Sequence, residues 1–508
     1  MMTFPSVSRG RSSNETKSSF SLSVCSYIVI GNGPIGASVA KHLIASLVTN
    51  TRASVAEGRE QKEIVVTIVD GNPLGIGSSH SDRARLIRTF DAEGDVFWTR
   101  WNRRSLEAFP KIERLWNEAG YVDHNNQSIY SGGNGERIGG KKKETNPRKS
   151  FFTRCGALLL GDEKFVARSK KAADDSLAST SPSSFSLISP AECRRKWPYL
   201  NPKPGCDVAM FDPSGGIIDP HAFIEAQNDV AASMCSGIGM SYNGQEDPAI
   251  RLEIQPGVAA KLRNGGRTVE LASGKILTAT EKIILCGGAY SGSLLRDSGI
   301  GNGSDTGEEK PRASKRTVAL LEVDPASVLR NAMPTIKYAF GLSEQQHQGQ
   351  QQKGQATTGE HSRVEAGSVY LLPPVLYPER GGKWFVKIGG GPNDYFGDEG
   401  SVASKRELDD WLSSEGDSSS AAWLAEIARS LLPELGARGW QSMACVTTTM
   451  ATTNETDRTG LLVDDILGDG TLVAVSACQG KGAGPSDAIA ADIVRNLLEP
   501  GRPHGPRN

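Results

Sequence analysis

The hydrophobic positions of the chain fall into short apolar runs separated by longer stretches with helical spacing. Five runs rich in β-branched and apolar residues are expected to be strands: residues 27–30, 64–69, 282–286, 384–388 and 472–476. Large apolar side chains recur at helical intervals within residues 96–117, at Phe97, Trp101, Phe109, Ile112 and Trp116. Residues 486–498 repeat an apolar side chain every four positions and predict a second helix. Strands that alternate with helices indicate an α/β fold.

Polar segments interrupt this pattern. Gly, Ser, Gln or charged residues dominate four stretches, which we expect to be surface loops: residues 122–149, 301–316, 343–363 and 412–420. Residues 1–24 are rich in Ser, with three basic residues and one acidic residue. This composition fits a disordered tail and an organellar transit segment equally well.

Composition excludes several classes of partner. The 508 residues carry 57 Lys and Arg against 58 Asp and Glu, so no overall field attracts nucleic acid or an anionic membrane. No run approaches the roughly 18 apolar residues that a membrane helix needs. The eight cysteines are scattered without metal-ligand spacing, so we expect neither disulfides nor a metal site. We therefore predict a soluble intracellular protein, cytoplasmic or organellar, and expect a monomer.

A glycine-rich turn follows the first strand. Gly31, Gly33 and Gly36 match G-x-G-x-x-G between an apolar strand and a helix, with Pro34 and Ile35 inside the motif. The glycines permit a tight turn, close approach of a pyrophosphate and close helix packing, while the helix N-terminus offers free N–H groups. The motif predicts a dinucleotide site, and a turn without a ligand is the alternative.

The second strand ends in an acidic residue. Asp70 is placed to accept hydrogen bonds from a ribose and would repel a 2′-phosphate, which favours FAD or NAD over NADP. The interval between the first helix and this strand, residues 46–63, is longer than usual for such a motif.

Further motifs favour FAD over NAD as the cofactor. They resemble motifs of a flavoprotein family and occur along the chain in the same order as in that family. They are "GSSHSDRARLIR" (77–88), "FFTRCGALLLG" (151–161), "SPAECRRKWPYL" (189–200), "AMFDPSGGIIDPHAF" (209–223), "EKIILCGGAYSGSLL" (281–295), "VYLLPP" (369–374), "KWFVKIGGG" (383–391), "MACVTTTM" (443–450) and "VAVSACQGKGAGPSDAIAADIV" (473–494). The chain resembles the sarcosine oxidase and N-methyl amino acid oxidase branch of the FAD-dependent, D-amino-acid-oxidase-like superfamily over residues 26–497.

The resemblance implies a Rossmann-like FAD-binding domain and a sheet-based α+β substrate domain, both discontinuous in sequence. We assign residues 25–120, 205–305 and 440–500 to the FAD-binding domain. Residues 121–204 and 306–439, with their polar insert loops, form the substrate domain in this assignment.

The resemblance also assigns candidate site residues. His80, Arg85 and Arg88 match the family's H-x-D-x-R-I-I-R pattern, with one extra residue between Asp82 and Arg85, and a surface basic cluster is the alternative. Guanidinium groups there would stabilise anionic reduced flavin or bind a substrate carboxylate. The remaining cofactor positions implied by the resemblance are Ser79, Gly288, Gly480, Lys481 and Gly482.

Cys445 occupies the position at which this branch attaches FAD through a cysteinyl thioether, and a small buried hydrophobe is the alternative. The aromatic residue usual two positions later is replaced by Thr447, which leaves covalent attachment open.

Lys387 matches the family's oxygen-activating lysine. Strand alternation places Val386 and Ile388 on one face and Lys387 on the other, which is the flavin face in the family. A solvated strand lysine is the alternative. Tyr370 is a candidate lid or hydrogen-bond donor. The family's carboxylate-binding lysine is replaced by Gly484, which suggests a wider pocket for a bulkier amine.

Together these residues predict an FAD-dependent amine or amino-acid oxidase. It would transfer a hydride from a C–N bond to flavin and pass the electrons to dioxygen, giving hydrogen peroxide. One alternative is a dehydrogenase of the same fold with a quinone or protein acceptor. Another is a non-catalytic flavin-binding protein.

Overall fold

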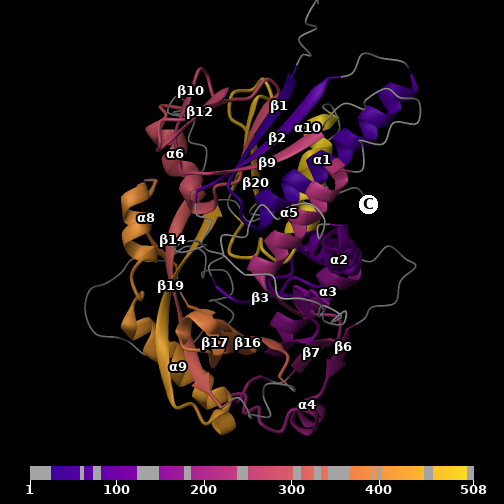
Figure 1. The fold of residues 1–508 in the computed structure, drawn as a ribbon. Helices are drawn as coiled ribbons and strands as arrows, with labels where there is room; N and C mark the ends of the chain where they lie inside the picture. The colour runs from indigo at the N-terminus through magenta and orange to yellow at the C-terminus, as the bar shows by residue number, and fades with distance from the viewer. Residues whose placement is uncertain are drawn as a thin grey trace, which may run out of the picture.

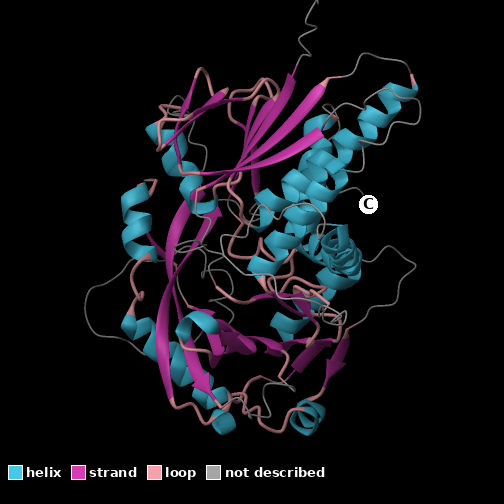
Figure 2. Cartoon of the chain, in the orientation of Figure 1, coloured by secondary structure: helices cyan, strands magenta, loops and turns pink. Residues whose placement is uncertain are grey.

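The structure is a computed structural model in which two large sheets lie one above the other in the view of Figure 1. Figure 2 shows helices beside the upper sheet and around the lower one. The structure describes residues 24–57, 62–71, 82–122, 148–176, 185–206, 208–236, 250–300, 311–324, 333–340, 367–391, 393–397, 402–450, 461–476 and 478–499.

The upper sheet has six strands. Their order is β20 (Leu462–Asp465), β21 (Leu472–Ser476), β13 (Lys282–Leu285), β1 (Val24–Ile30), β2 (Glu63–Asp70) and β9 (Ile250–Pro256). All neighbours pair in parallel except β20, which is antiparallel to β21. Four of the five predicted strands are confirmed here, and the α/β prediction holds.

Apolar layers cover both faces of this sheet. Helices pack on one face: α1 (Pro34–Ala56), α2 (Val96–Val122), α5 (Pro220–Ser236) and α10 (Ser486–Leu498). The other face packs against α6 (Ser291–Asp297) and a small antiparallel sheet of β10 (Ala259–Arg263), β11 (Thr268–Leu271) and β12 (Ile276–Thr278). Because both faces are buried, the inner strands β21, β13, β1 and β2 consist mainly of consecutive apolar residues.

The helices refine the predictions. The predicted helix 486–498 is confirmed as α10, and the helix predicted over 96–117 is confirmed as α2, which continues to Val122. Within α2 the placement of Phe97 on the apolar face is wrong: its side chain is 37 % exposed, and Trp98 is fully buried instead. Residues 46–56 of the long interval before the second strand are helical, since α1 runs for 23 residues and ends at Ala56.

The lower sheet has nine strands. Along its main path these are β18 (Asp394–Tyr395), β14 (Pro311–Val323), β17 (Lys383–Gly390), β16 (Gly367–Tyr377), β15 (Thr335–Phe340), β5 (Ala157–Gly161), β7 (Val208–Asp212) and β6 (Ser186–Ile188). The ninth strand, β19 (Gly439–Met450), pairs with β14. The fifth predicted strand, 384–388, lies within β17.

Strand register sorts the side chains of this sheet between two faces. Val386 and Ile388 lie in a core with residues of α9 (Ser418–Leu431). Lys387 pairs with Leu320 on β14 and Leu372 on β16 and points to the opposite face. Toward β7 that opposite face is covered by α3 (Glu163–Asp175).

The remaining elements connect these layers. They are β3 (Arg85–Ile87), β8 (Gly216–Ile218) and β4 (Phe152–Thr153) in one small sheet, α4 (Pro190–Lys196), α8 (Lys405–Leu412), and the 3₁₀ helices η2 (Gly288–Tyr290), η3 (Pro378–Arg380) and η4 (Pro433–Leu435). Capping boxes fix the starts of α4 and α8, where Ser189 and Ser404 each bond reciprocally with a glutamate three residues later.

Two of the predicted loops are wrong in part. Residues 311–316 begin β14 and residues 418–420 begin α9, because neighbouring strands and an Asp417 cap stabilise these polar segments. Most of 122–149 and all of 343–363 fall outside the described residues. The domain division stays a prediction, although β7 and β19, inside the assigned FAD-binding segments, pair within the nine-stranded sheet. No helix in the described ranges is long and apolar enough to cross a membrane.

Candidate active site

A glycine cradle lies at the carboxyl end of the central strand β1. Gly31 has φ +104°, a conformation that disfavours other residues, and its N–H donates to the Val69 carbonyl at 2.9 Å. A Cβ on Gly31 would lie 2.5 Å from the Cys286 carbonyl oxygen, and one on Gly36 would lie 1.9 Å from the Gly31 carbonyl oxygen. Backbone alone fits here. Gly33 precedes Pro34, the first residue of α1, and Ile35 packs toward the core behind the turn.

Polar side chains continue this cradle. Asp70 ends β2, and its Oδ2 accepts a hydrogen bond from Asn32 Nδ2 at 3.1 Å. Asn228 Nδ2 of α5 donates to Asn32 Oδ1 at 3.2 Å. Gly288, with φ +57°, begins η2 just after β13. Glycine turn, helix start and terminal carboxylate meet at one sheet edge, an arrangement that fits the dinucleotide half of FAD. The two asparagines were not predicted, although Asn32 lies inside the glycine motif.

A second glycine loop, residues 478–485, joins the cradle to the lower sheet. Gln479 N–H donates to the Thr448 carbonyl of β19 at 2.8 Å. A Cβ on Gly480 would lie 2.9 Å from Thr447 Cγ2, and one on Gly482 would lie 3.4 Å from Ile35 Cδ1 of α1. The loop therefore lies between the start of α1 and strand β19.

Gly484 of this loop packs on β3. A Cβ there would lie 3.1 Å from both Ile87 Cβ and the Leu86 carbonyl oxygen. Close packing of backbone against β3 thus explains why a glycine is suited to this position. Residues of β3 occupy the space that a side chain at position 484 would take. The glycine therefore does not by itself widen a pocket.

A buried charge network surrounds Lys387. Its ammonium contacts Asp82 Oδ2 and donates to the Ala84 carbonyl at 3.2 Å. Arg85 Nη1 donates to the same Asp82 oxygen at 2.7 Å, and the Tyr377 hydroxyl donates to Asp82 Oδ1 at 2.6 Å. Lys387 is 3 % exposed, so the solvated alternative is wrong. Burial lowers the pKa of Lys387, while burial of Asp82 is outweighed by Lys387 and Arg85, which hold its pKa well below the usual range.

Tyr370 lies beside this lysine on the same face. The Lys387 ammonium is 5.6 Å from the centre of the Tyr370 ring. A Cβ on Gly389 would lie 2.4 Å from the Tyr370 hydroxyl oxygen, so the phenol extends over the backbone of β17. Burial raises the pKa of Tyr370, which keeps the hydroxyl protonated as a hydrogen-bond donor.

Cys445 lies directly across from Arg316 in the pairing of β19 with β14. Arg316 donates to the Gly391 carbonyl at 2.7 Å and to Thr447 Oγ1 at 3.3 Å, and it also contacts Asn393 Oδ1. Burial lowers the pKa of Arg316. Arg316 was not predicted, because only the pairing of β14 with β19 brings it next to the cysteine.

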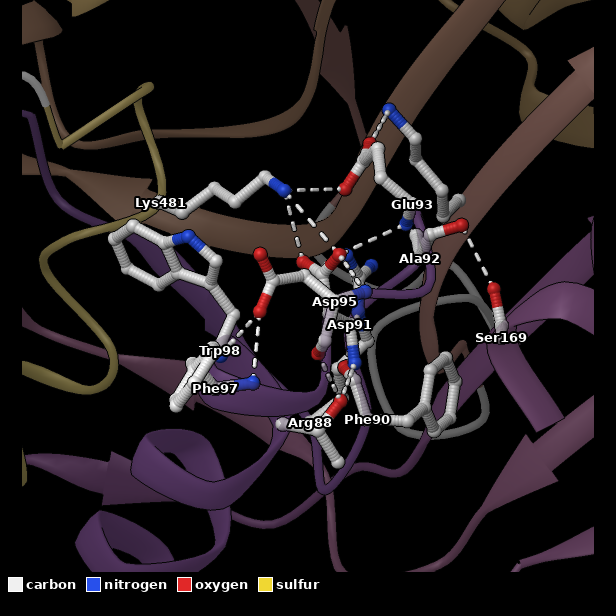
Figure 3. Close-up of polar contacts among 12 residues, drawn as sticks. Arg88, Phe90, Asp91, Ala92, Glu93, Asp95, Phe97, Trp98, Ser169 and Lys481 are labelled. Carbon is white, nitrogen blue, oxygen red and sulfur yellow. Dashed lines mark hydrogen bonds and ion pairs between the residues drawn. The ribbon is translucent and has the colours of Figure 1, made fainter. Parts of the chain in front are cut away.

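A second charge cluster lies around Lys481 (Figure 3). The Lys481 ammonium is 3.0 Å from Asp91 Oδ1 and 2.8 Å from Glu93 Oε2, and Lys337 of β15 is 3.5 Å from Glu93 Oε1. Burial raises the pKa of Asp91, and although burial opposes the charge of Lys481, the two carboxylates raise its pKa. Lys481 was predicted to contact the cofactor. In the structure its ammonium forms ion pairs with two carboxylates of the chain, those of Asp91 and Glu93.

Arg88 belongs to the same region. Its side chain is buried, with Nε donating to the Phe90 carbonyl at 3.0 Å and the guanidinium 5.5 Å from the Phe90 ring centre. The alternative of a surface basic cluster is thus wrong for Arg88 and Arg85, whereas Arg83 is partly exposed and pairs with Glu379. Ser79 and His80 lie outside the described residues. Across the described ranges, no group of three potential metal ligands occurs.

Comparisons with known proteins identify the family and the fold. A family model described as FAD dependent oxidoreductase matches residues 26–495. No curated protein matches the sequence. Solved structures share the fold: NikD, "an unusual amino acid oxidase essential for nikkomycin biosynthesis", has a TM-score of 0.54 at 13 % identity, covering 93 % of this chain and 94 % of that one.

Two further structures are similar over most of their length. L-proline dehydrogenase from P. horikoshii has a TM-score of 0.55 at 14 % identity, with 94 % of each chain covered. Amadoriase I from Aspergillus fumigatus, a fructosyl amine:oxygen oxidoreductase, has a TM-score of 0.54 at 16 % identity, covering 93 % of this chain and 86 % of that one. At these identities the likeness establishes the fold.

Proposed function

Because the chain belongs to the FAD dependent oxidoreductase family, we propose that it oxidises the C–N bond of a small-molecule amine or amino acid, with dioxygen as electron acceptor and hydrogen peroxide as product. The single observation that carries the choice of acceptor is the buried ammonium of Lys387. It lies on the face of the nine-stranded sheet opposite the α9 core, beside Tyr370, Arg85 and Cys445.

FAD is the cofactor of this family, and when bound it supplies the hydride-accepting chemistry. We assign its dinucleotide half to the cradle of Gly31, Gly33, Gly36 and Asp70, where only backbone fits and a carboxylate ends β2. Asn32 orients that carboxylate by a hydrogen bond. The loop that contains Gly480 and Gly482 leads into α10, whose N-terminus favours negative charge.

The chain's own residues supply electrostatics and orientation. Lys387 and Arg85 keep positive charge in a site screened from water, where it stabilises an anion more strongly than in solution. Burial raises the pKa of Tyr370, so its hydroxyl is protonated and is the group we assign as a hydrogen-bond donor to the substrate. Arg88, whose Nε is held by the Phe90 carbonyl, is the cation we assign to a substrate carboxylate.

The experiment that tests the acceptor separates the two half-reactions. Lys387→Met keeps the length of the side chain and removes its charge. We expect anaerobic reduction by a reactive amine, found by screening an amine library for flavin bleaching, to change by only a few-fold. We expect reoxidation by dioxygen to slow about 100- to 1,000-fold, the usual effect of losing one fixed charge at a developing anion. Lys383→Met is the matched control, since Lys383 lies on the same strand but is exposed and paired with Glu322.

Stopped-flow reoxidation at the wild-type rate in Lys387→Met would contradict the oxidase proposal. The second candidate is a dehydrogenase with a quinone or protein acceptor. It is favoured by one observation, the contact of Asp82 with Lys387, because an ion-paired lysine exerts a weaker field than an isolated one. Turnover with a quinone but not with dioxygen would select it. Failure of every amine to bleach the flavin would favour a non-catalytic flavoprotein.

We also propose that Cys445 is the attachment point if the FAD is covalently bound. Cys445 lies opposite Arg316 in the strand pairing, and Arg85 of β3 interacts with it electrostatically. A cysteine sulfur on this face of the sheet is the nucleophile that thioether formation requires.

A further inference from the structure

The Asp82 carboxylate is fully committed to donors. Its two oxygens receive the Lys387 ammonium, Arg85 Nη1 at 2.7 Å, the Tyr377 hydroxyl at 2.6 Å and the Arg83 backbone N–H at 2.7 Å. An ionised carboxylate offers about four acceptor positions, and four donors occupy them here. Protonation would replace one of these acceptors by a donor, so the network requires the anion. Asp82 is 2 % exposed, which leaves these contacts shielded from water.

Charges around Lys387 are unbalanced without this carboxylate. The titratable and charged groups that face it come from three elements and from the turn before β3: Asp82, Arg85, Tyr370 and Cys445. Behind them, Tyr377 donates to Asp82 and Arg316 lies opposite Cys445. Asp82 supplies the one carboxylate contact to the Lys387 ammonium in the part of the chain that the structure describes. Arg85 repels that ammonium, and burial also favours the neutral amine.

We propose that Asp82 is a positioning residue that keeps Lys387 charged and holds its ammonium on the face of the sheet that carries Tyr370. This inference rests on the proposed function of Lys387 and adds a condition to it. A buried amine without its counter-ion would release its proton near neutral pH, and a neutral amine cannot stabilise a developing anion. Asp82 would thereby set the pH range over which Lys387 acts.

The decisive readout is thermodynamic and needs no turnover. Asp82→Asn removes the counter-ion, and the pKa of Lys387 should then fall by about two pH units or more. In the unfolded chain this lysine keeps its proton to about pH 10.4. Above the lowered pKa the unfolded state binds one more proton than the folded state. The unfolding equilibrium of Asp82→Asn should therefore become less favourable by up to about tenfold per pH unit as pH rises, relative to wild type.

Controls isolate the lysine as the titrating group. Asp82→Asn combined with Lys387→Met should lose the added slope, because the group that releases the proton is gone. Glu322→Gln applies the same carboxylate-to-amide change beside Lys383, an exposed pair on the same strand, and should leave the slope at its wild-type value. Asp82→Glu, which keeps the charge, should restore most of the wild-type pH profile. If Asp82→Asn does not fold, the double variant keeps the proposal testable: it should fold, because the unpaired buried cation is gone, and a double variant that is as unstable as Asp82→Asn would contradict the ion-pair role.

Urea denaturation across neutral to alkaline pH measures these slopes, and stopped-flow reoxidation measures the functional consequence. We expect reoxidation in Asp82→Asn to decline about tenfold per pH unit above the new pKa of Lys387, while the wild-type rate stays level over the same range. An Asp82→Asn slope equal to that of wild type would overturn the positioning role even if Lys387→Met is slow with dioxygen. A shifted slope with normal reoxidation in Lys387→Met would instead support the ion pair and refute the oxidase function.

Discussion

Gly36 offers a sharp test of the dinucleotide cradle, because an added methyl group would meet fixed backbone. It lies in α1, where alanine is about 0.5–1 kcal/mol better than glycine on conformational grounds alone. A Cβ would nevertheless lie 1.9 Å from the Gly31 carbonyl oxygen, against an ordinary contact of about 3.5 Å. That carbonyl belongs to a turn fixed by the Gly31 N–H bond to Val69, so it yields less readily than a side chain.

Overpacking of this kind costs about 1–3 kcal/mol, and a backbone neighbour favours the upper end. After the helix-propensity gain, we expect Gly36→Ala to lower the free energy of unfolding of the apoprotein by about 2 kcal/mol. Relief of the clash must also move the turn that faces the cofactor. We therefore expect the FAD content to fall as well. Each tenfold loss of affinity for FAD corresponds to a binding free energy that is weaker by about 1.4 kcal/mol.

Urea denaturation of the apoprotein and the flavin absorbance of the purified protein measure the two effects separately. Gly292→Ala is the matched control, since a Cβ at Gly292 in α6 would lie 2.7 Å from Val402 Cγ1, the end of a side chain that can rotate. The control should retain its flavin and change in stability by less than about 1 kcal/mol. A Gly36→Ala protein with wild-type stability and full flavin content would refute the close-approach argument.

Two predictions concern other parts of the fold. Acid denaturation should leave FAD attached to the wild-type protein and release it from Cys445→Ser; release from both would mean that no thioether exists. Asp487 of α10 contacts the Lys41 ammonium and is 3.1 Å from His42 Nε2, so Asp487→Asn should cost about 3–5 kcal/mol at neutral pH by leaving a buried cation unpaired. Burial opposes the Asp487 charge, but His42 and Lys41 lower its pKa, so this stability is present above about pH 4 and lost as pH falls. The gap between variant and wild type in urea midpoints should therefore narrow in acid, and an equal gap at both pH values would argue against the ion pair.

Local pattern determined a large part of this protein. Four strands of the six-stranded sheet, α10 and the glycine turn were predictable because burial on both faces, helical periodicity and positive φ leave direct marks on neighbouring residues. Strand alternation likewise placed Lys387 opposite Val386 and Ile388. Each of these inferences requires only residues within one element.

The tertiary structure decided what each charged group contacts. Asp82 and Lys387 are 305 positions apart, and Lys481 and Asp91 are 390 positions apart. The spacing of residues within one element therefore cannot predict either ion pair. The pairing of β14 with β19 likewise brings Arg316 opposite Cys445. The packing of the second glycine loop on β3 places the backbone of Gly484 close to Leu86 and Ile87. Sequence pattern records which face of an element is buried, whereas the free energy of a buried charge depends on the partner that the fold supplies.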